Sequence, residues 1–192
     1  MKTITIILLF FLCTFSISAQ QKLTIVPSVQ EWNYLNETIS FEDINVNWSE
    51  ETTKDQIVLL MRFRKELEAL GIKIGKTIGK KTLSLYFDTN YKAPNKEMDT
   101  YQIHFDKKTT IKASSYNALV YATRTILQLC SQPVYKNALP KGIIKDYPSY
   151  QKRMVLLDVA RKFFTIAEIK DFIKIMAWVK MNELHLHLSD NS

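Results

Sequence analysis

The sequence predicts an α+β domain followed by a strand–helix–strand unit with parallel strands. In the first two thirds of the chain, strand-like segments with alternating apolar residues accompany two amphipathic helical segments. A connector then holds three of the five prolines, at positions 133, 140 and 148. Beyond it, two apolar strands flank one helix, and a crossover of this kind favours parallel pairing of the strands.

Residues 1–19 have the pattern of a secretory signal peptide. Lys2 is the only charge before Lys22, residues 4–15 are almost wholly apolar, and small residues follow at positions 16, 18 and 19. The apolar run is shorter than the roughly 20 residues of a membrane span, although a retained amino-terminal anchor is the alternative. We therefore expect a secreted or periplasmic protein, with no stable membrane span after cleavage of the signal peptide.

Composition excludes some classes of partner. The chain of 192 residues is 46% hydrophobic, which suits a globular core, and carries a formal net charge of +7. Its lysines are scattered, and the longest basic clusters, at 80–81 and 107–108, are short and not interleaved with aromatic residues. This pattern argues against a nucleic-acid partner. Cys130 would be alone after signal cleavage and lies on an apolar helix face, so we expect it to be buried without a disulfide.

The first domain is predicted at 22–131, with a connector at 132–149. Thr53 and Gln56 have the spacing of a capping box, which opens a helix that Gly71 ends. Strands are expected at 83–87, 101–105 and 109–113, the last two as a hairpin, and a second helix at about 115–129.

The strand–helix–strand unit is predicted within 150–192. The apolar run 153–160 is typical of a strand buried on both faces. Residues 183–188 form the second strand. Parallel folds bind ligands at the carboxyl ends of their strands, where Arg161 and Asp190 follow the two strands. We expect these two side chains to lie at the same opening, at the carboxyl ends of the strands. The alternative is that they are surface charges or only pair with each other.

A dinucleotide-binding turn and a metal site are the two kinds of cofactor site that such a unit could carry. The turn after the first strand, 160–168, contains no glycine, so a dinucleotide-binding turn is excluded. His185 and His187 share one strand face, but the third histidine, His104, belongs to the first domain. We therefore expect no metal and no cofactor, and we expect both histidines to be hydrogen-bonded in the interior of the fold.

The segment LLDVARKFFTIAEIKDFIKIMAWVKMNELHLHLSDN, residues 156–191, resembles the opening of the catalytic barrel of family 20 glycoside hydrolases, the β-N-acetylhexosaminidases. Their barrels begin with a strand end containing LDxxR, a helix ending MA-x-x-K-x-N and a strand HxHLxDD. The matching residues are Leu157, Asp158 and Arg161, then Met176, Ala177, Lys180 and Asn182, then His185, His187, Leu188 and Asp190. The preceding residues resemble the family's non-catalytic amino-terminal domain.

The resemblance implies a fold and roles for two residues. It makes 150–192 the first strand, helix and second strand of an incomplete (β/α)8 TIM barrel. In the family, the arginine matching Arg161 binds hydroxyls of the non-reducing sugar, and the aspartate matching Asp190 supports the general-acid carboxylate through a histidine. Three residues depart from the pattern, namely Lys162 for histidine, Leu186 for tryptophan and Asn191 for a second aspartate.

The resemblance also implies a function for the longer protein. The family's Asp–Glu pair lies further downstream, so we expect no catalytic residue within this chain and no activity of the chain itself. The whole protein would hydrolyse terminal β-linked N-acetylhexosamine residues of glycans or chitooligosaccharides by substrate-assisted retaining catalysis. Residues 150–192 should aggregate or order only by packing on the first domain. The alternative function is a secreted, non-catalytic carbohydrate- or protein-binding α+β module.

Overall fold

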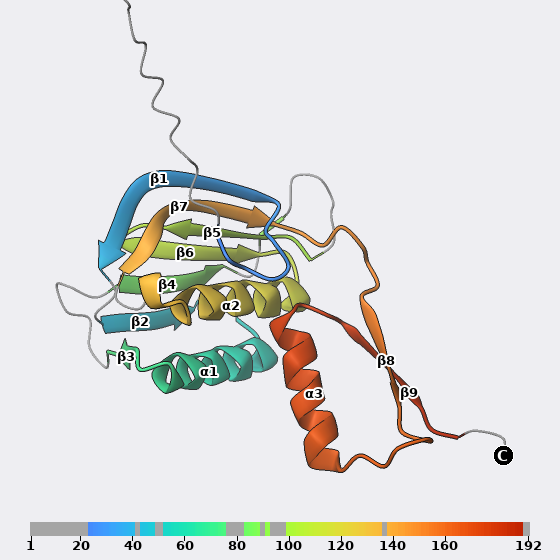
Figure 1. Cartoon of the computed structure of the whole chain (residues 1–192). Helices are drawn as coiled ribbons and strands as arrows, with labels where there is room; N and C mark the ends of the chain where they lie inside the picture. The colour runs from blue at the N-terminus through green and yellow to red at the C-terminus, as the bar shows by residue number, and fades with distance from the viewer. Residues whose placement is uncertain are drawn as a thin grey trace, which may run out of the picture.

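The computed structural model describes residues 23–40, 43–48, 52–75, 83–88, 91–92, 99–135 and 138–189, so the predicted signal peptide and Asp190 lie outside the described residues. Within these ranges seven strands form one sheet, in the order β1-β7-β5-β6-β4-β2-β3, and β8 pairs with β9 in a second sheet (Figure 1). The elements are β1 (Glu31–Ser40), β2 (Asp43–Trp48), α1 (Lys54–Ala69), β3 (Lys73–Ile74), β4 (Leu83–Asp88), β5 (Tyr101–Phe105), β6 (Lys108–Ala113), α2 (Tyr116–Cys130), a 3-10 turn (Pro133–Tyr135), β7 (Ala138–Asp146), β8 (Met154–Asp158), α3 (Ile166–Trp178) and β9 (Glu183–His187).

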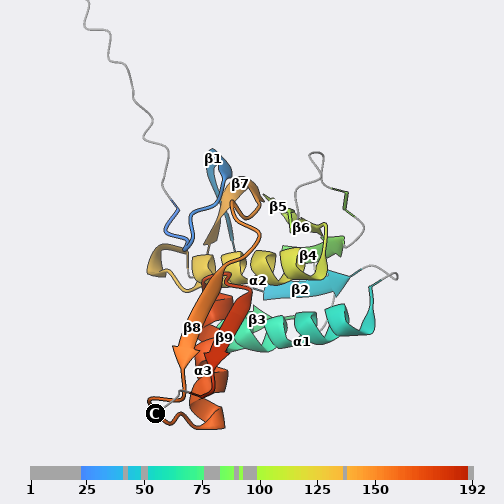
Figure 2. The same ribbon diagram turned by 90° about the vertical axis from the view of Figure 1, so that its right-hand side faces the viewer.

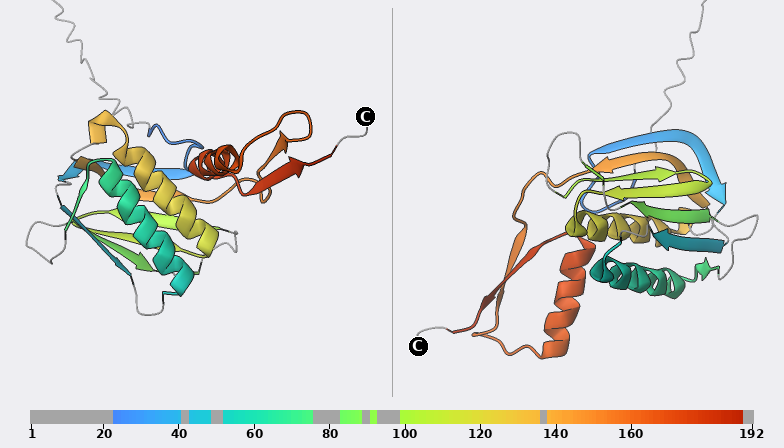
Figure 3. Two further views of the ribbon diagram at one scale, coloured as in Figure 1. Left: turned by 90° about the horizontal axis from the view of Figure 1, so that it is seen from below. Right: turned by 180° about the vertical axis from the view of Figure 1, so that it is seen from behind.

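Helices α1 and α2 lie side by side across one face of the seven-stranded sheet (Figure 3). The predicted capping box opens α1, since the Thr53 hydroxyl accepts from the Gln56 backbone N–H and the Gln56 side chain accepts from the Thr53 N–H at 2.8 Å. The side chains between helices and sheet are fully buried, among them Leu60 and Phe63 of α1 and Ile103 of β5. The predicted α+β fold of this part is confirmed.

The predicted hairpin and the predicted connector have different outcomes. Strands β5 and β6 pair antiparallel with Ile103 opposite Ile111, as a hairpin requires. The connector at 132–149 is wrong for residues 138–146, because they form β7, which pairs with both β1 and β5 near one side of the sheet. The first domain therefore extends to Asp146, and we use "first domain" for the described residues from 23 to 146.

The β8–α3–β9 segment, called the βαβ unit, projects from the end of the helical layer (Figures 1 and 2). Strands β8 and β9 are parallel, as predicted, with Met154 opposite Glu183 and Asp158 opposite His187. The capping box at Thr165 and Glu168 opens α3. The expectation that β8 is buried on both faces is wrong, since Met154 and Leu156 are 53% and 57% exposed. Only β9 pairs with β8 among the described residues, so both faces of β8 keep access to solvent.

Candidate functional site

The carboxyl ends of β8 and β9 form one edge of the βαβ unit. The Val159 backbone N–H donates to the His187 carbonyl oxygen at 3.1 Å, so the ladder continues to the last residues of both strands. Arg161 follows β8 at this edge. The predicted convergence of Arg161 with Asp190 stays a prediction, because Asp190 lies outside the described residues.

The turn that carries Arg161 is organised by Asp158. One carboxylate oxygen, Oδ1, accepts the backbone N–H groups of Ala160 and Arg161, both at 3.0 Å. The Arg161 N–H bond is the main cause of a lowered Asp158 pKa, and the Ala160 bond and the nearby His187 and Arg161 charges act in the same direction. The ionised form of Asp158 thus fixes the backbone from which the exposed Arg161 side chain extends.

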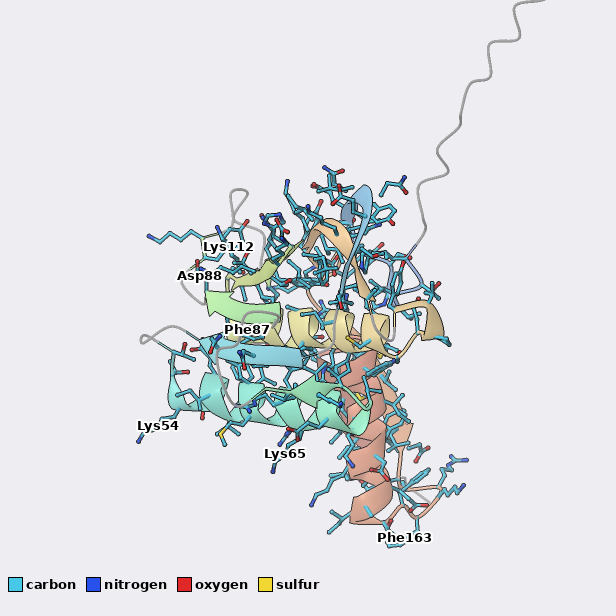
Figure 4. All side chains as sticks on the ribbon, turned by 90° about the vertical axis from the view of Figure 1, so that its left-hand side faces the viewer. Lys54, Lys65, Phe87, Asp88, Lys112 and Phe163 are labelled. Atoms are coloured by element: carbon cyan, nitrogen blue, oxygen red, sulfur yellow. The ribbon has the colours of Figure 1, made fainter. Side chains whose placement is uncertain are left out.

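The segment that follows Arg161 at this edge includes an exposed aromatic residue. Phe163 is 84% exposed and lies at the tip of the unit, far from the first domain (Figure 4). The Lys162 ammonium lies 5.3 Å from the centre of the Phe164 ring. The guanidinium of Arg161 can donate to hydroxyl groups, and the exposed Phe163 ring offers an apolar face, so this segment has a chemistry suited to sugar hydroxyls and ring faces.

The histidines of β9 differ from the expectation. His185 is exposed, and His187 is half-buried beside Asp158. The predicted interior position is therefore wrong for His185, because this face of the two-stranded sheet is not covered by other described residues. Across the described ranges, no group of three or more His, Cys, Asp or Glu side chains could hold a metal ion. None of the helices in this part of the chain is long and apolar enough to cross a membrane.

Sequence reasoning missed a buried polar cluster at the opposite end of the unit, where the carboxyl end of α3 and the residues after it meet the first domain. The Lys180 ammonium lies 2.9 Å from Asp146 Oδ2 and 2.9 Å from the Tyr101 hydroxyl. Tyr101 donates to the same Asp146 oxygen at 2.5 Å, and the Gln30 backbone N–H donates to Asp146 Oδ1 at 3.2 Å. The only sequence signal was Lys180 in the MA-x-x-K-x-N pattern, because its partners are distant in the sequence.

Burial shifts the pKa of two members of this cluster, Lys180 and Tyr101. The Lys180 and Asp146 side chains are 5% and 8% exposed. Loss of hydration lowers the pKa of Lys180, and Asp146 opposes that shift. Burial also raises the pKa of Tyr101 well above 10, and the adjacent Asp146 charge adds to the rise. The Lys180 and Asp146 side chains thus pair directly, and the raised pKa keeps the Tyr101 phenol, which contacts both of them, neutral at pH 7.

A cavity of about 230 Å³ opens beside the cluster. Tyr121, Tyr147 and Tyr150 line it together with Arg153 and the members of the cluster. Its charged groups bond to the protein itself, since Arg153 donates to the Lys180 carbonyl at 2.8 Å and to the Tyr121 hydroxyl at 2.6 Å. The cavity is thus part of the junction between the first domain and the βαβ unit, at the end opposite Arg161.

Two family models match the chain in succession. Residues 22–147 match "Glycosyl hydrolase family 20, domain 2", and residues 150–192 match "Glycosyl hydrolase family 20, catalytic domain". The boundary between them follows β7 directly, which agrees with the extent of the first domain described above.

The curated relatives that the chain matches include β-hexosaminidases. The chain is 36% identical over 113 residues to a β-hexosaminidase of Akkermansia muciniphila, covering 58% of this chain and 22% of the relative. It is 32% identical over 131 residues to a β-hexosaminidase of Porphyromonas gingivalis, covering 64% and 16%. The chain thus spans about a fifth of the length of these relatives.

Among solved structures, an exo-β-N-acetylglucosaminidase of Vibrio harveyi in complex with N-acetylglucosamine aligns with a TM-score of 0.69 at 22% identity, covering 86% of this chain and 25% of that one. A chitobiase of Flavobacterium johnsoniae aligns with a TM-score of 0.66 at 24% identity, covering 86% and 27%. These alignments show a shared fold. Since the match over residues 22–147 alone covers more than half of the chain, the chain belongs to glycoside hydrolase family 20.

Proposed function

We propose that this chain is the amino-terminal part of a β-N-acetylhexosaminidase that removes terminal β-linked N-acetylhexosamine from glycans or chitooligosaccharides. The proposal rests on one observation: the residues that match the catalytic domain are the residues that form the parallel strand pair. The catalytic-domain match covers residues 150–192, and the same residues contain the parallel β8–β9 pair with Arg161 at its carboxyl edge. Named relatives include a chitooligosaccharidolytic β-N-acetylglucosaminidase of Bombyx mori, which supports this substrate class.

In this proposal the βαβ unit is the first strand, helix and second strand of a (β/α)8 barrel, a fold of about 250 residues whose other strands belong to a longer protein. The exposed apolar side chains of the unit support it. Leu156 of β8 and Ile175 of α3 are 57% and 62% exposed. Neighbouring strands and helices of a barrel would cover such surfaces, and apolar patches of this kind mark contacts with further protein.

Arg161 and Asp190 take the roles that the resemblance implies. Arg161 donates to hydroxyls of the non-reducing sugar from the turn that Asp158 holds. Asp190 orients a histidine that supports the general acid. In the family the acetamido oxygen of the substrate attacks the anomeric carbon while the acid protonates the leaving oxygen, and water then opens the intermediate with retention. The acid and its partner lie outside this chain, so the 192 residues alone do not hydrolyse substrate.

Residues 1–19 direct the protein out of the cytoplasm in this proposal, with cleavage near Ala19. Mass spectrometry of the mature protein from its native host tests this directly. A mature amino terminus at or near Gln20 is the expected result. A mature protein that still contains Met1 to Ala19 would contradict it.

The activity is tested with the reading frame continued beyond residue 192. That protein should release 4-nitrophenol from the N-acetyl-β-glucosaminide, and Arg161→Ala should lower kcat/KM by roughly 100-fold or more, because substrate hydroxyls lose a charged donor. Lys170→Ala, an exposed lysine of α3, is the matched control and should keep wild-type activity. Hydrolysis by the purified 192-residue chain, or equal activity of both variants, would contradict the proposal. Glycan binding without any downstream barrel would favour the binding-module alternative.

A further inference from the structure

The βαβ unit has almost no core of its own. Among the described residues from 150 to 189, only Met176 and Lys180 are buried. Both lie at or just after the carboxyl end of α3, which is the end that abuts α2 of the first domain (Figures 1 and 2). The first domain, in contrast, has a continuous core formed by both of its helices and its sheet. Among the described residues, the buried contacts of the unit are therefore those that it makes with the first domain.

Polar contacts at the junction reach three different elements of the first domain. Lys180 bonds to Asp146 of β7 and Tyr101 of β5, as described above. The Trp178 carbonyl accepts from Gln128 Nε2 of α2 at 2.7 Å. Arg153 donates to the Tyr121 hydroxyl of α2, and its guanidinium carbon lies 5.0 Å from the centre of the Tyr121 ring. Contacts from three residues of the unit to a sheet and a helix define one orientation.

The same residues hold β8 and β9 together at their amino ends. The Lys180 carbonyl accepts from Arg153 Nε at 2.8 Å. Asn182 Oδ1 accepts from the Arg153 backbone N–H at 2.8 Å, and the Asn182 N–H donates to the Arg153 carbonyl at 3.1 Å. Lys180 and Asn182 are the two polar residues of the MA-x-x-K-x-N pattern. Lys180 bonds to the first domain, and Asn182 bonds to Arg153, at the end of the unit opposite Arg161.

We propose that the first domain has a function of its own: it is a folding platform that orders the βαβ unit, and Lys180 is the residue that makes this order depend on the platform. A docked unit pairs Lys180 with Asp146. A unit docked in another orientation would leave one of these charges buried without its partner, which is strongly unfavourable. An undocked unit returns Lys180 to water, and its described residues keep no other buried polar contact. This proposal does not depend on the proposed hydrolysis.

Hydrogen exchange of the whole chain, followed by mass spectrometry, tests the platform. Lys180→Met keeps a long side chain and removes the charge, and Asp146 keeps its bonds from Tyr101 and the Gln30 N–H. We expect exchange in β8 and β9 to accelerate by about ten-fold or more, while α1 and α2 keep their protection. Lys174→Met is the matched control, because Lys174 is an exposed lysine of the same helix, paired with Asp171, and should change neither region.

Asp146→Asn supplies a second variant from the other side of the pair and should give the same loss in β8 and β9. In pulse-labelling during refolding, amides of the first domain should become protected before those of the unit. Unchanged protection of β8 and β9 in both variants would overturn the proposal. It would also fail if Lys180→Met lowered protection in the first domain and the unit equally, or if the unit became protected first.

Discussion

Asp158 and His187 occupy partner positions at the ends of two parallel strands, and the Asp158 carboxylate also accepts two backbone N–H groups of the turn that leads to Arg161. Asp158, the last residue of β8, therefore links the end of β9 with the turn that follows β8. This places the backbone of Arg161 relative to the end of β9.

The Asp158 carboxyl should titrate below its ordinary pKa of 3.8. The shift is downward, so the interactions stabilise the folded state above pH 3.8 and are lost as pH falls through the lower, folded-state pKa. Carbon-13 NMR titration of the carboxyl measures the midpoint. Asp158→Asn has a weaker acceptor and should accelerate exchange of the Arg161 amide proton at pH 7. A midpoint at or above 3.8 would contradict this account.

Gly142→Ala should strongly destabilise the first domain. Gly142 lies in β7 with φ 153°, and a Cβ atom there would lie 2.1 Å from the Asn33 carbonyl oxygen of β1. Because backbone must move to make room, we expect the free energy of unfolding to fall by about 3 kcal/mol. Gly71→Ala is the control, with φ 81° and no atom within 4 Å of the added Cβ, and should cost about 1 kcal/mol. Urea titrations compare them, and equal losses would disprove the steric argument.

Arg124→Met should loosen the contact between α1 and α2. Arg124 is largely buried in α2 and makes a two-pronged salt bridge to Glu66 of α1, with one N–O distance of 2.9 Å. The substitution leaves the Glu66 carboxylate without its cation, and we expect the free energy of unfolding to fall by about 2 kcal/mol. Lys145→Met breaks an exposed pair with Glu31 and should cost about 0.5 kcal/mol or less. A similar cost in both variants would show that the α1–α2 bridge adds nothing specific.

Cys130 should be inert in the folded protein. Burial raises the pKa of its thiol to about 12, so very little thiolate is present at pH 8. Iodoacetamide followed by peptide mapping should leave Cys130 unmodified in native protein and label it fully in urea. Complete labelling of the native protein within minutes would show that the carboxyl end of α2 opens readily.

Local patterns predicted the elements with local causes. Capping boxes at Thr53 and Thr165 need only the residue three positions further on, and both helices begin where the boxes place them. Strand β7 was missed because Pro140 and Gly142 are typical of loops. The structure accommodates Pro140 because the β5 pairing begins only at Gly142, so the position of the proline pairs with β1 alone.

Long-range contacts were not accessible from sequence patterns. Lys180 lies 34 positions from Asp146 and 79 from Tyr101, and no periodicity connects residues so far apart. The burial predicted for β8 failed for a related reason, since its composition suits a strand with neighbours on both sides, and β9 is its one partner among the described residues. At the candidate site, the parallel pairing of the strands was predicted correctly, and the convergence of Arg161 with Asp190 stays a prediction. The two backbone N–H bonds that Asp158 accepts from the turn were not predicted.

Lys180 adopts φ 59°, the left-handed conformation that commonly follows the last residue of a helix and that glycine adopts most readily. Its N–H still bonds to the Ala177 carbonyl, so this backbone geometry ends α3. The position thus has two opposing requirements, because the backbone favours glycine by about 1 kcal/mol while the junction requires a long cationic side chain. Replacing the residue that ends a helix by glycine is a standard way to stabilise a protein. At position 180 the same change would relax the end of α3 but release the βαβ unit from the first domain.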